Sequence, residues 1–247
     1  MVEIKNVPGV PDEVRRIFDP FLKEFIAQHK DNVVSVFLYG SAAGPDFIPG
    51  VSDINSVAVV KTISLDLLQK SLRLVASGKR KRIQAPLILT LEHIRLSLDV
   101  FPIEFLDMKD HYAVLYGRDV LQEISVESGH VRLFCEQQLK GRLIRIRQAY
   151  LEVGLKRRGI EALLKESLGS LFPVFRALIR MKGIPVPVDK AEILKVLQES
   201  HEIDLSAMAA IWKDKRNDER IAGRDVREVF GTYIEQLETL AQTVDRL

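Results

Sequence analysis

A glycine–serine pair and an acidic residue that follows it are the residues whose types and spacing first suggest chemistry. Gly40 and Ser41 come after an apolar, β-branched run, and eleven residues separate Ser41 from Asp53. A corner of small residues that exposes backbone N–H groups and a hydroxyl suits an oxyanion such as phosphate. Asp53 precedes Asn55 by two positions, so that in a strand both side chains lie on one face. The stretch therefore predicts a phosphate-binding corner beside a pair of polar side chains.

These residues need a strand on each side of the corner. The run 33–39 (VVSVFLY) predicts the first strand, and a loop containing Pro45, Pro49 and Gly50 leads to a second strand that is entered through Asp53 and ends at about Val60. The segment 86–89 predicts a short buried strand. Helices are predicted at 12–25, at 64–77 and after Thr90, from apolar residues at helical spacing.

A further strand is predicted over 101–108 (FPIEFLDM), with Pro102 near its start, where proline is tolerated. In that strand Glu104 and Asp107 would lie on opposite faces.

Length and composition bound the class of protein. The chain has 247 residues, 47% of them hydrophobic and 28% charged, which is ordinary for a folded globular protein of two modest domains. A formal charge of +2 is too mild to favour nucleic acid as a partner. The single cysteine, Cys135, fits a reducing cytosol and is expected to be buried. No stretch approaches the ~20 apolar residues of a membrane span, so that a cytoplasmic protein without a membrane partner is expected.

The pattern changes at about residue 128. Beyond it, β-branched runs give way to apolar residues at i, i+3 and i+4, which predicts a bundle of about five helices. We therefore expect an α+β protein with two domains, a short mixed sheet flanked by helices over 1–124 and a helical bundle over 125–247. The predicted helices of the bundle span 129–155, 161–181 with an interruption at Pro173, 190–199, 205–213 and 224–247.

The N-terminal half resembles the nucleotidyltransferase superfamily of DNA polymerase beta, in particular its small kanamycin- and streptomycin-type adenylyltransferases. The family pattern is an apolar residue, Gly, Gly or Ser, a spacer of about ten residues, and then Asp-apolar-Asp/Glu-apolar. This sequence has Tyr39-Gly40-Ser41, the eleven-residue spacer and Asp53-Ile54-Asn55-Ser56. The Pro-Ile-Glu segment at 102–104 is similar to the Pro-x-Glu segment of the streptomycin-type enzymes. The segment 112–121 (YAVLYGRDVL) is similar to the family's closing segment, in which a strand-like piece leads through Gly117 into the next domain.

The resemblance implies a nucleotide site built from these residues. Gly40 and Ser41 would hold phosphates, while Asp53, Asn55 and Glu104 would hold Mg²⁺ or Mn²⁺, with Asp53 and Glu104 catalytic and Asp107 the alternative to Glu104. The implied partners are a nucleoside triphosphate, ATP first, and a small-molecule or protein acceptor that offers a hydroxyl group. A homodimer is left open.

One departure bears on activity, because Asn55 stands where the family has its second carboxylate. The amide keeps an oxygen at that position but removes one negative charge. The leading hypothesis is an enzyme, a nucleotidyltransferase of reduced activity. The alternative is a catalytically inactive protein of the same fold that acts as a nucleotide sensor or antitoxin-type partner. The run Lys79–Arg82 is interpreted as a solvated turn, with polyphosphate or RNA as the other reading.

Overall fold

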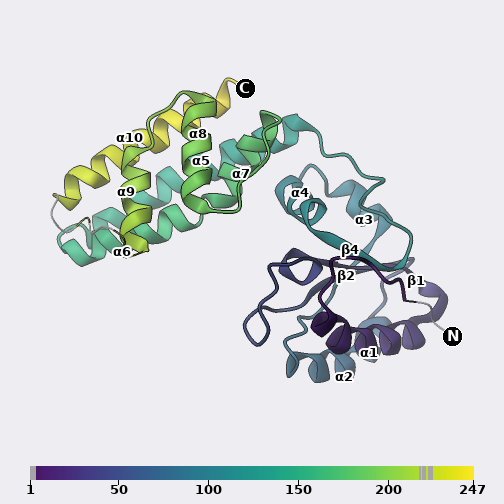
Figure 1. The fold of residues 1–247 in the computed structure, drawn as a ribbon. Helices are drawn as coiled ribbons and strands as arrows, with labels where there is room; N and C mark the ends of the chain where they lie inside the picture. The colour runs from purple at the N-terminus through teal and green to yellow at the C-terminus, as the bar shows by residue number, and fades with distance from the viewer. Residues whose placement is uncertain (1–3, 217, 219–220, 222–224) are drawn as a thin grey trace. The chain divides into compact units, whose positions relative to one another are not determined.

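The structure is a computed structural model that describes residues 4–216, 218, 221 and 225–247. It contains two compact units, Met1–Val126 and Glu127–Leu247. The first unit is built on a sheet and the second is helical, so the predicted α+β fold class is confirmed (Figure 1). Among the described helices, none has the length and apolar character needed to cross a membrane.

The sheet of the N-terminal unit has four strands in the order β3-β2-β1-β4. The central strand β1 (Val33–Tyr39) is antiparallel to β2 (Asn55–Val60) on one side and to β4 (Tyr112–Gly117) on the other. The outer strand β3 (Leu87–Thr90) runs parallel to β2. Parallel neighbours need a crossover, and here the connection contains α2 (Leu65–Lys79). The mixed sheet predicted from the sequence is therefore present.

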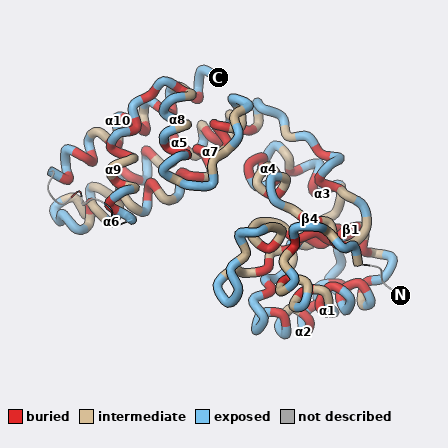
Figure 2. The backbone as a smooth tube through the Cα atoms, viewed as in Figure 1, coloured by how far each residue is buried: buried red, intermediate tan, exposed pale blue. Residues whose placement is uncertain are grey.

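Helices cover both faces of this sheet, so the central strands β1 and β2 are buried between two cores, whereas no residue of β3 is buried (Figures 1 and 2). Helix α1 (Asp12–His29) and α2 lie on one face, while α3 (Leu91–Leu96) and α4 (Pro102–Asp110) lie on the other. Alternating residues of β2 divide between the two cores. Ala58 packs with α1 and α2, whereas Val57 and Val59 pack with the other helices.

Local capping explains where two of these helices begin. The Ser64 hydroxyl accepts a hydrogen bond from the Leu67 N–H at 3.2 Å, and α2 starts at the next residue. The Thr90 hydroxyl accepts one from the His93 N–H at 3.0 Å at the start of α3. Such caps satisfy N–H groups that the first helical turn cannot pair. Two short 3₁₀ helices, η1 (Lys30–Asn32) and η2 (Gly40–Ala43), precede and follow β1.

The strand predicted at 101–108 is wrong, because this segment forms α4. Pro102 occupies the first turn of the helix, where its missing N–H costs nothing and its fixed φ fits. The buried residues Pro102, Phe105 and Met108 are three apart, as on one face of a helix. Burial does not alternate from one residue to the next, as it would in the predicted strand.

The C-terminal unit contains six helices among its described residues. Cys135 is fully buried in the first of them, and burial raises the pKa of its thiol to about 12. The predicted helix at 161–181 is two helices, since Pro173 lies in the first turn of the second one. The last predicted helix began at Arg224, which lies outside the described residues. The helices are α5 (Ser128–Val153), α6 (Arg157–Gly169), α7 (Phe172–Met181), α8 (Lys190–His201), α9 (Ser206–Lys215) and α10 (Val226–Asp245).

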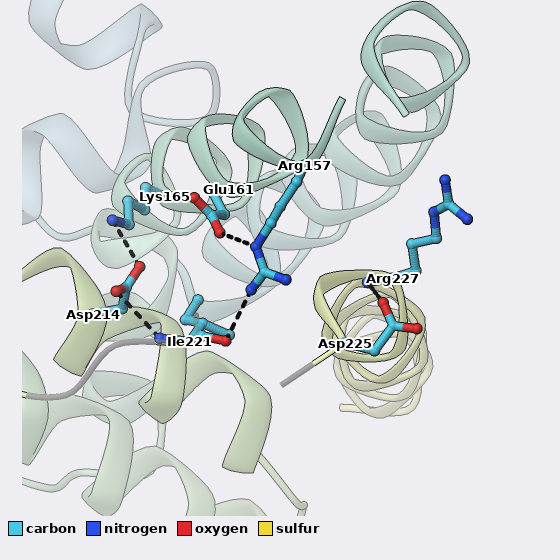
Figure 3. Close-up of polar contacts among 7 residues, drawn as sticks. All are labelled: Arg157, Glu161, Lys165, Asp214, Ile221, Asp225 and Arg227. Carbon is cyan, nitrogen blue, oxygen red and sulfur yellow. Dashed lines mark hydrogen bonds and ion pairs between the residues drawn. The ribbon is translucent and has the colours of Figure 1, made fainter. Parts of the chain in front are cut away.

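A polar network centred on Asp214 joins α6 to α9 (Figure 3). The Asp214 carboxylate is 2.7 Å from the Lys165 ammonium and accepts a hydrogen bond from the Ile221 N–H at 3.3 Å. Arg157 donates to Glu161 at 2.9 Å and to the Ile221 carbonyl at 3.3 Å. Asp214 is only 8% exposed, so these partners offset the cost of burying its charge.

Candidate functional site

The glycine–serine corner forms the end of β1. Gly40 has φ of +69°, a left-handed conformation that glycine adopts readily and other residues rarely do. Its N–H donates to the His111 carbonyl oxygen at 2.9 Å, so this group is used within the fold rather than pointing outward. Within the described part of the chain, the Ser41 hydroxyl has no hydrogen-bond partner, and Ser41 is partly exposed. Gly40 therefore shapes the corner, while Ser41 is the residue available to a ligand.

The strand register brings the corner and the Asp53–Asn55 segment to one edge of the sheet. Tyr39, the last residue of β1, is the partner of Asn55, the first residue of β2. Gly40 follows Tyr39, and Ile54 precedes Asn55, so both chain segments leave the sheet at the same place. This edge of the sheet, with Gly40, Ser41, Asp53 and Asn55, is called the β1–β2 edge below.

The side chains of this edge have a defined direction. Ile54 is buried in the core beneath α1 and α2, and it bridges to Ile83. Because side chains alternate along a strand, Asn55 lies on the opposite face, which it shares with Val57 and Val59. Asp53 lies just outside the strand, and its side chain is 40% exposed.

Arg82 is the residue that contacts Asp53. Its guanidinium Nη2 lies 3.1 Å from the Asp53 carboxylate, and Nη2 also donates to the Val51 carbonyl. Its Nε donates to the Ser52 carbonyl at 3.3 Å. The backbone holds Arg82 in place, because its carbonyl accepts the Ile54 N–H at 2.9 Å. One guanidinium therefore binds three consecutive residues at the entrance to β2.

Glu104 comes from a different kind of element than predicted. It lies in the first turn of α4, at an exposed position, while its neighbours Ile103 and Phe105 are buried. Asp107, the alternative acid, is also on α4 and not on a strand. Helix α4 packs on the face of the sheet that carries Asn55, through Phe105 and Met108. A catalytic role for Glu104 stays a prediction, but the strand that was expected to present it is absent.

The β1–β2 edge alone offers few ligands to the predicted divalent metal ion. No group of three or more Asp, Glu, His or Cys side chains suited to a metal is found among the described residues. Asp53 is the one carboxylate of the β1–β2 edge, Asn55 is neutral, and the segment 83–90 that lies along β2 contains no acidic residue. Mg²⁺ usually takes one or two carboxylates with substrate phosphates. Here a guanidinium already pairs with the single carboxylate, so no step below is derived through a metal ion.

Two tyrosines, Tyr39 on β1 and Tyr112 on β4, lie at the same end of the sheet as Asn55 and are neutral. Tyr39 is the register partner of both Asn55 and Tyr112. Burial raises the pKa of Tyr39. Burial, together with a 2.8 Å hydrogen bond to Asp119, raises the pKa of Tyr112 to about 12. Neither hydroxyl therefore carries charge at neutral pH, and that of Tyr112 donates to Asp119.

Sequence reasoning missed His111 and the contact of Arg82 with Asp53, although it kept polyphosphate or RNA as the other reading of the run 79–82. The interpretation of 79–82 as a solvated turn fits Lys79, Arg80 and Lys81, which are exposed. Arg82 differs because its backbone is hydrogen-bonded to Ile54 and its side chain is turned to Asp53, two residues that are distant in the sequence. A single hint was available, since Arg82 is the last cation before a predicted strand. The backbone contact of His111 with Gly40 had no sequence signal.

The arrangement of sheet and helices is shared with a solved structure. The sequence matches no protein-family model and no curated protein. Among solved structures, the chain is similar to spectinomycin adenyltransferase AAD(9) from Enterococcus faecialis, solved with ATP and spectinomycin. The TM-score is 0.51 at 14% sequence identity, and the match covers 89% of this chain and 98% of that one. At this identity the likeness shows a shared fold, over both halves of the chain.

Proposed function

We propose that this protein binds a nucleoside triphosphate at the β1–β2 edge and transfers its nucleoside monophosphate to a hydroxyl group. The observation that carries the proposal is the register pair Tyr39–Asn55, which puts the corner and Asp53 at one edge of the sheet. ATP is the first nucleotide to test, because the adenyltransferase of similar fold was solved with ATP.

The reaction asks for positioning and charge more than for covalent catalysis. The acceptor oxygen attacks the α-phosphorus, the bond from that phosphorus to the β-phosphate oxygen breaks, and pyrophosphate leaves. The hydroxyl proton must pass to a base, and the Asp53 carboxylate is the group of this edge that can accept it. The Ser41 hydroxyl and the Arg82 guanidinium are the donors that can bind phosphate oxygens.

The acceptor is proposed to be a small molecule with a free hydroxyl group. The support is the fold shared with an enzyme that was solved with spectinomycin. The helical unit has many arginines, yet several are already paired, as in Arg147 with Glu238 and Arg157 with Glu161. Those pairs give no evidence for an anionic acceptor.

A second candidate function is nucleotide binding without transfer. The observation that favours it is the loss of carboxylates at this edge, where Asn55 is neutral and Glu104 lies on an exposed helix position. A protein of this kind would act as a nucleotide sensor or as an interaction partner whose state depends on ATP.

The deciding experiment measures pyrophosphate release and ATP binding on the same preparations. The chain is incubated with ATP and a panel of hydroxyl compounds that includes spectinomycin, with magnesium, with manganese and with a chelator. The variants are Asp53→Asn and Glu104→Gln, and Asp46→Asn is the control because Asp46 is an exposed acid of the same loop.

Transfer predicts pyrophosphate release that Asp53→Asn abolishes and Asp46→Asn leaves unchanged. A loss with Glu104→Gln would add that residue to the catalytic set. Binding of ATP with no release for any acceptor supports the second candidate. The absence of ATP binding under every condition would contradict both.

A further inference from the structure

The β1–β2 edge has a cation of its own. We infer that the Arg82 guanidinium, and not a divalent metal ion, supplies the positive charge that this edge sets against the phosphates of a nucleotide. Nucleotide binding is then independent of magnesium. The inference rests on the proposed nucleotide site and identifies the group that recognises its ligand.

The ligands available at this edge suit a metal ion poorly. A metal site at this edge would have Asp53 as its single carboxylate, with Asn55 as a neutral neighbour. The positions that β2 faces across the parallel pair, from Ile83 to Thr90, bring no acid. On these strand segments a hard divalent cation finds one negative charge, and that charge is already 3.1 Å from a guanidinium.

The backbone fixes the position of Arg82. Its φ is +60°, in the left-handed region that non-glycine residues rarely adopt. Hydrogen bonds on both sides hold this conformation. The Arg82 N–H donates to the Lys79 carbonyl at 3.1 Å, and the Arg82 carbonyl accepts from Ile54. The side chain therefore starts from a fixed point at the mouth of the sheet.

The Arg82 guanidinium keeps donors free for a ligand. Nε and Nη2 donate to the Ser52 and Val51 carbonyls, which orients the plane of the group. Among the described residues Nη1 has no partner, so its two N–H groups are available to a phosphate oxygen. Arginine suits this task because its planar fork matches phosphate and its charge cannot be removed.

The ion pair between Arg82 and Asp53 can give way to a phosphate ligand. The side chains of Arg82 and Asp53 are 47% and 40% exposed, and exposed pairs are weak. A polyphosphate carries more negative charge than one carboxylate, so it can compete for the guanidinium. Lys79, Arg80 and Lys81 are exposed beside it and raise the local positive potential that attracts an anion.

The test is calorimetric titration of the full chain with ATP, in excess chelator and in magnesium, and of the chain with Mn²⁺ alone. We expect ATP to bind in chelator at least as tightly as in magnesium, and Mn²⁺ alone to show no saturable binding. Arg82→Gln should weaken ATP binding about tenfold to a hundredfold, the loss of a hydrogen bond to a charged group. Arg82→Lys keeps the charge without the fork and should fall in between.

The matched control is Arg80→Gln. It removes the same charge from the same run at a residue whose side chain does not contact Asp53, and it should weaken binding less than Arg82→Gln does. Circular dichroism and thermal unfolding identify any variant that fails to fold, in which case Arg82→Lys carries the comparison.

The possible results separate the role of Arg82 from the existence of the nucleotide site. Binding that requires magnesium, or equal effects of the Arg80 and Arg82 variants, overturns the inference while the proposed nucleotide site stands. ATP binding that is absent with and without metal, in the native chain and in Asn55→Asp, removes the nucleotide site itself. Magnesium dependence that appears only in Asn55→Asp supports the inference, because the second carboxylate then restores a metal ligand set.

Discussion

Replacing Gly40 by alanine tests whether the corner at the end of β1 is a ligand site or only a turn. Its φ of +69° costs an alanine about 1–2 kcal/mol. A Cβ built there meets nothing within 4 Å, so no steric term is added. Alanine also restricts the unfolded chain, which returns about 0.4–1 kcal/mol. The net expectation for Gly40→Ala is a loss of roughly 1 kcal/mol of stability in a chain that still folds.

Two neighbouring glycines provide matched controls. Gly50 has a φ of +73° and equally open surroundings, so Gly50→Ala should cost a similar amount of stability. Gly44 has an extended backbone with φ of −155°, so Gly44→Ala should be neutral or slightly stabilising. Urea unfolding of the three variants measures these differences.

The functional readout separates Gly40 from Gly50. A shift of the backbone at Gly40 moves Ser41 directly, and the loss of one hydrogen bond to a charged phosphate weakens ATP binding about tenfold or more. Gly50→Ala and Gly44→Ala should leave the dissociation constant within about threefold of the native value. Equal ATP affinity in all three variants and the native chain would refute the idea that the corner holds phosphate.

Three further predictions concern the stability of the fold. Gly117→Ala should lower the free energy of unfolding by more than ~3 kcal/mol, measured by urea unfolding. The new Cβ would lie 2.0 Å from the Val34 carbonyl oxygen, and the φ of +74° adds backbone strain. A loss no larger than that of Gly40→Ala would contradict this. Burial lowers the pKa of His29 below 6.5, so the unfolded state binds more protons and stability should fall as the pH drops below about 6.5. His29→Gln should make the fall of stability with pH shallower without removing it, since the pKa of His201 is lowered as well. A pH profile of stability that is unchanged in His29→Gln would show that His29 does not cause the fall. Asp214→Ala should destabilise the helical unit by about 1–3 kcal/mol, because Lys165 loses its partner. A melting temperature equal to that of the native chain would show that the polar network around Asp214 adds nothing to stability.

Strong local signals in the sequence predicted much of the N-terminal fold correctly. The β-branched run of β1, the cap at Ser64 and the cap at Thr90 each act through neighbours in the chain, so pattern and propensity were enough. The edge that joins Gly40 to Asp53 was also foreseen, because the resemblance concerned the spacing of these residues.

The segment at α4 shows where such reasoning stops. Eight residues with proline near the start satisfy both a strand that alternates and a helix whose buried residues are three apart, and proline is tolerated at the start of either. Packing against Val57 and Val59 decides between them, and that information lies in distant parts of the chain. The contact of Arg82 with Asp53 is of the same kind, since it depends on the chain's return to the sheet after α2.

The most direct test of the nucleotide site is amide hydrogen exchange of the full chain with and without saturating ATP. The account predicts added protection at the corner Gly40–Ala43, at the entrance of β2 at residues 51–55 and at the segment 79–83 that carries Arg82, with the helical interior at Tyr233 unchanged. Protection elsewhere with none at the β1–β2 edge, while ATP is bound, would contradict it.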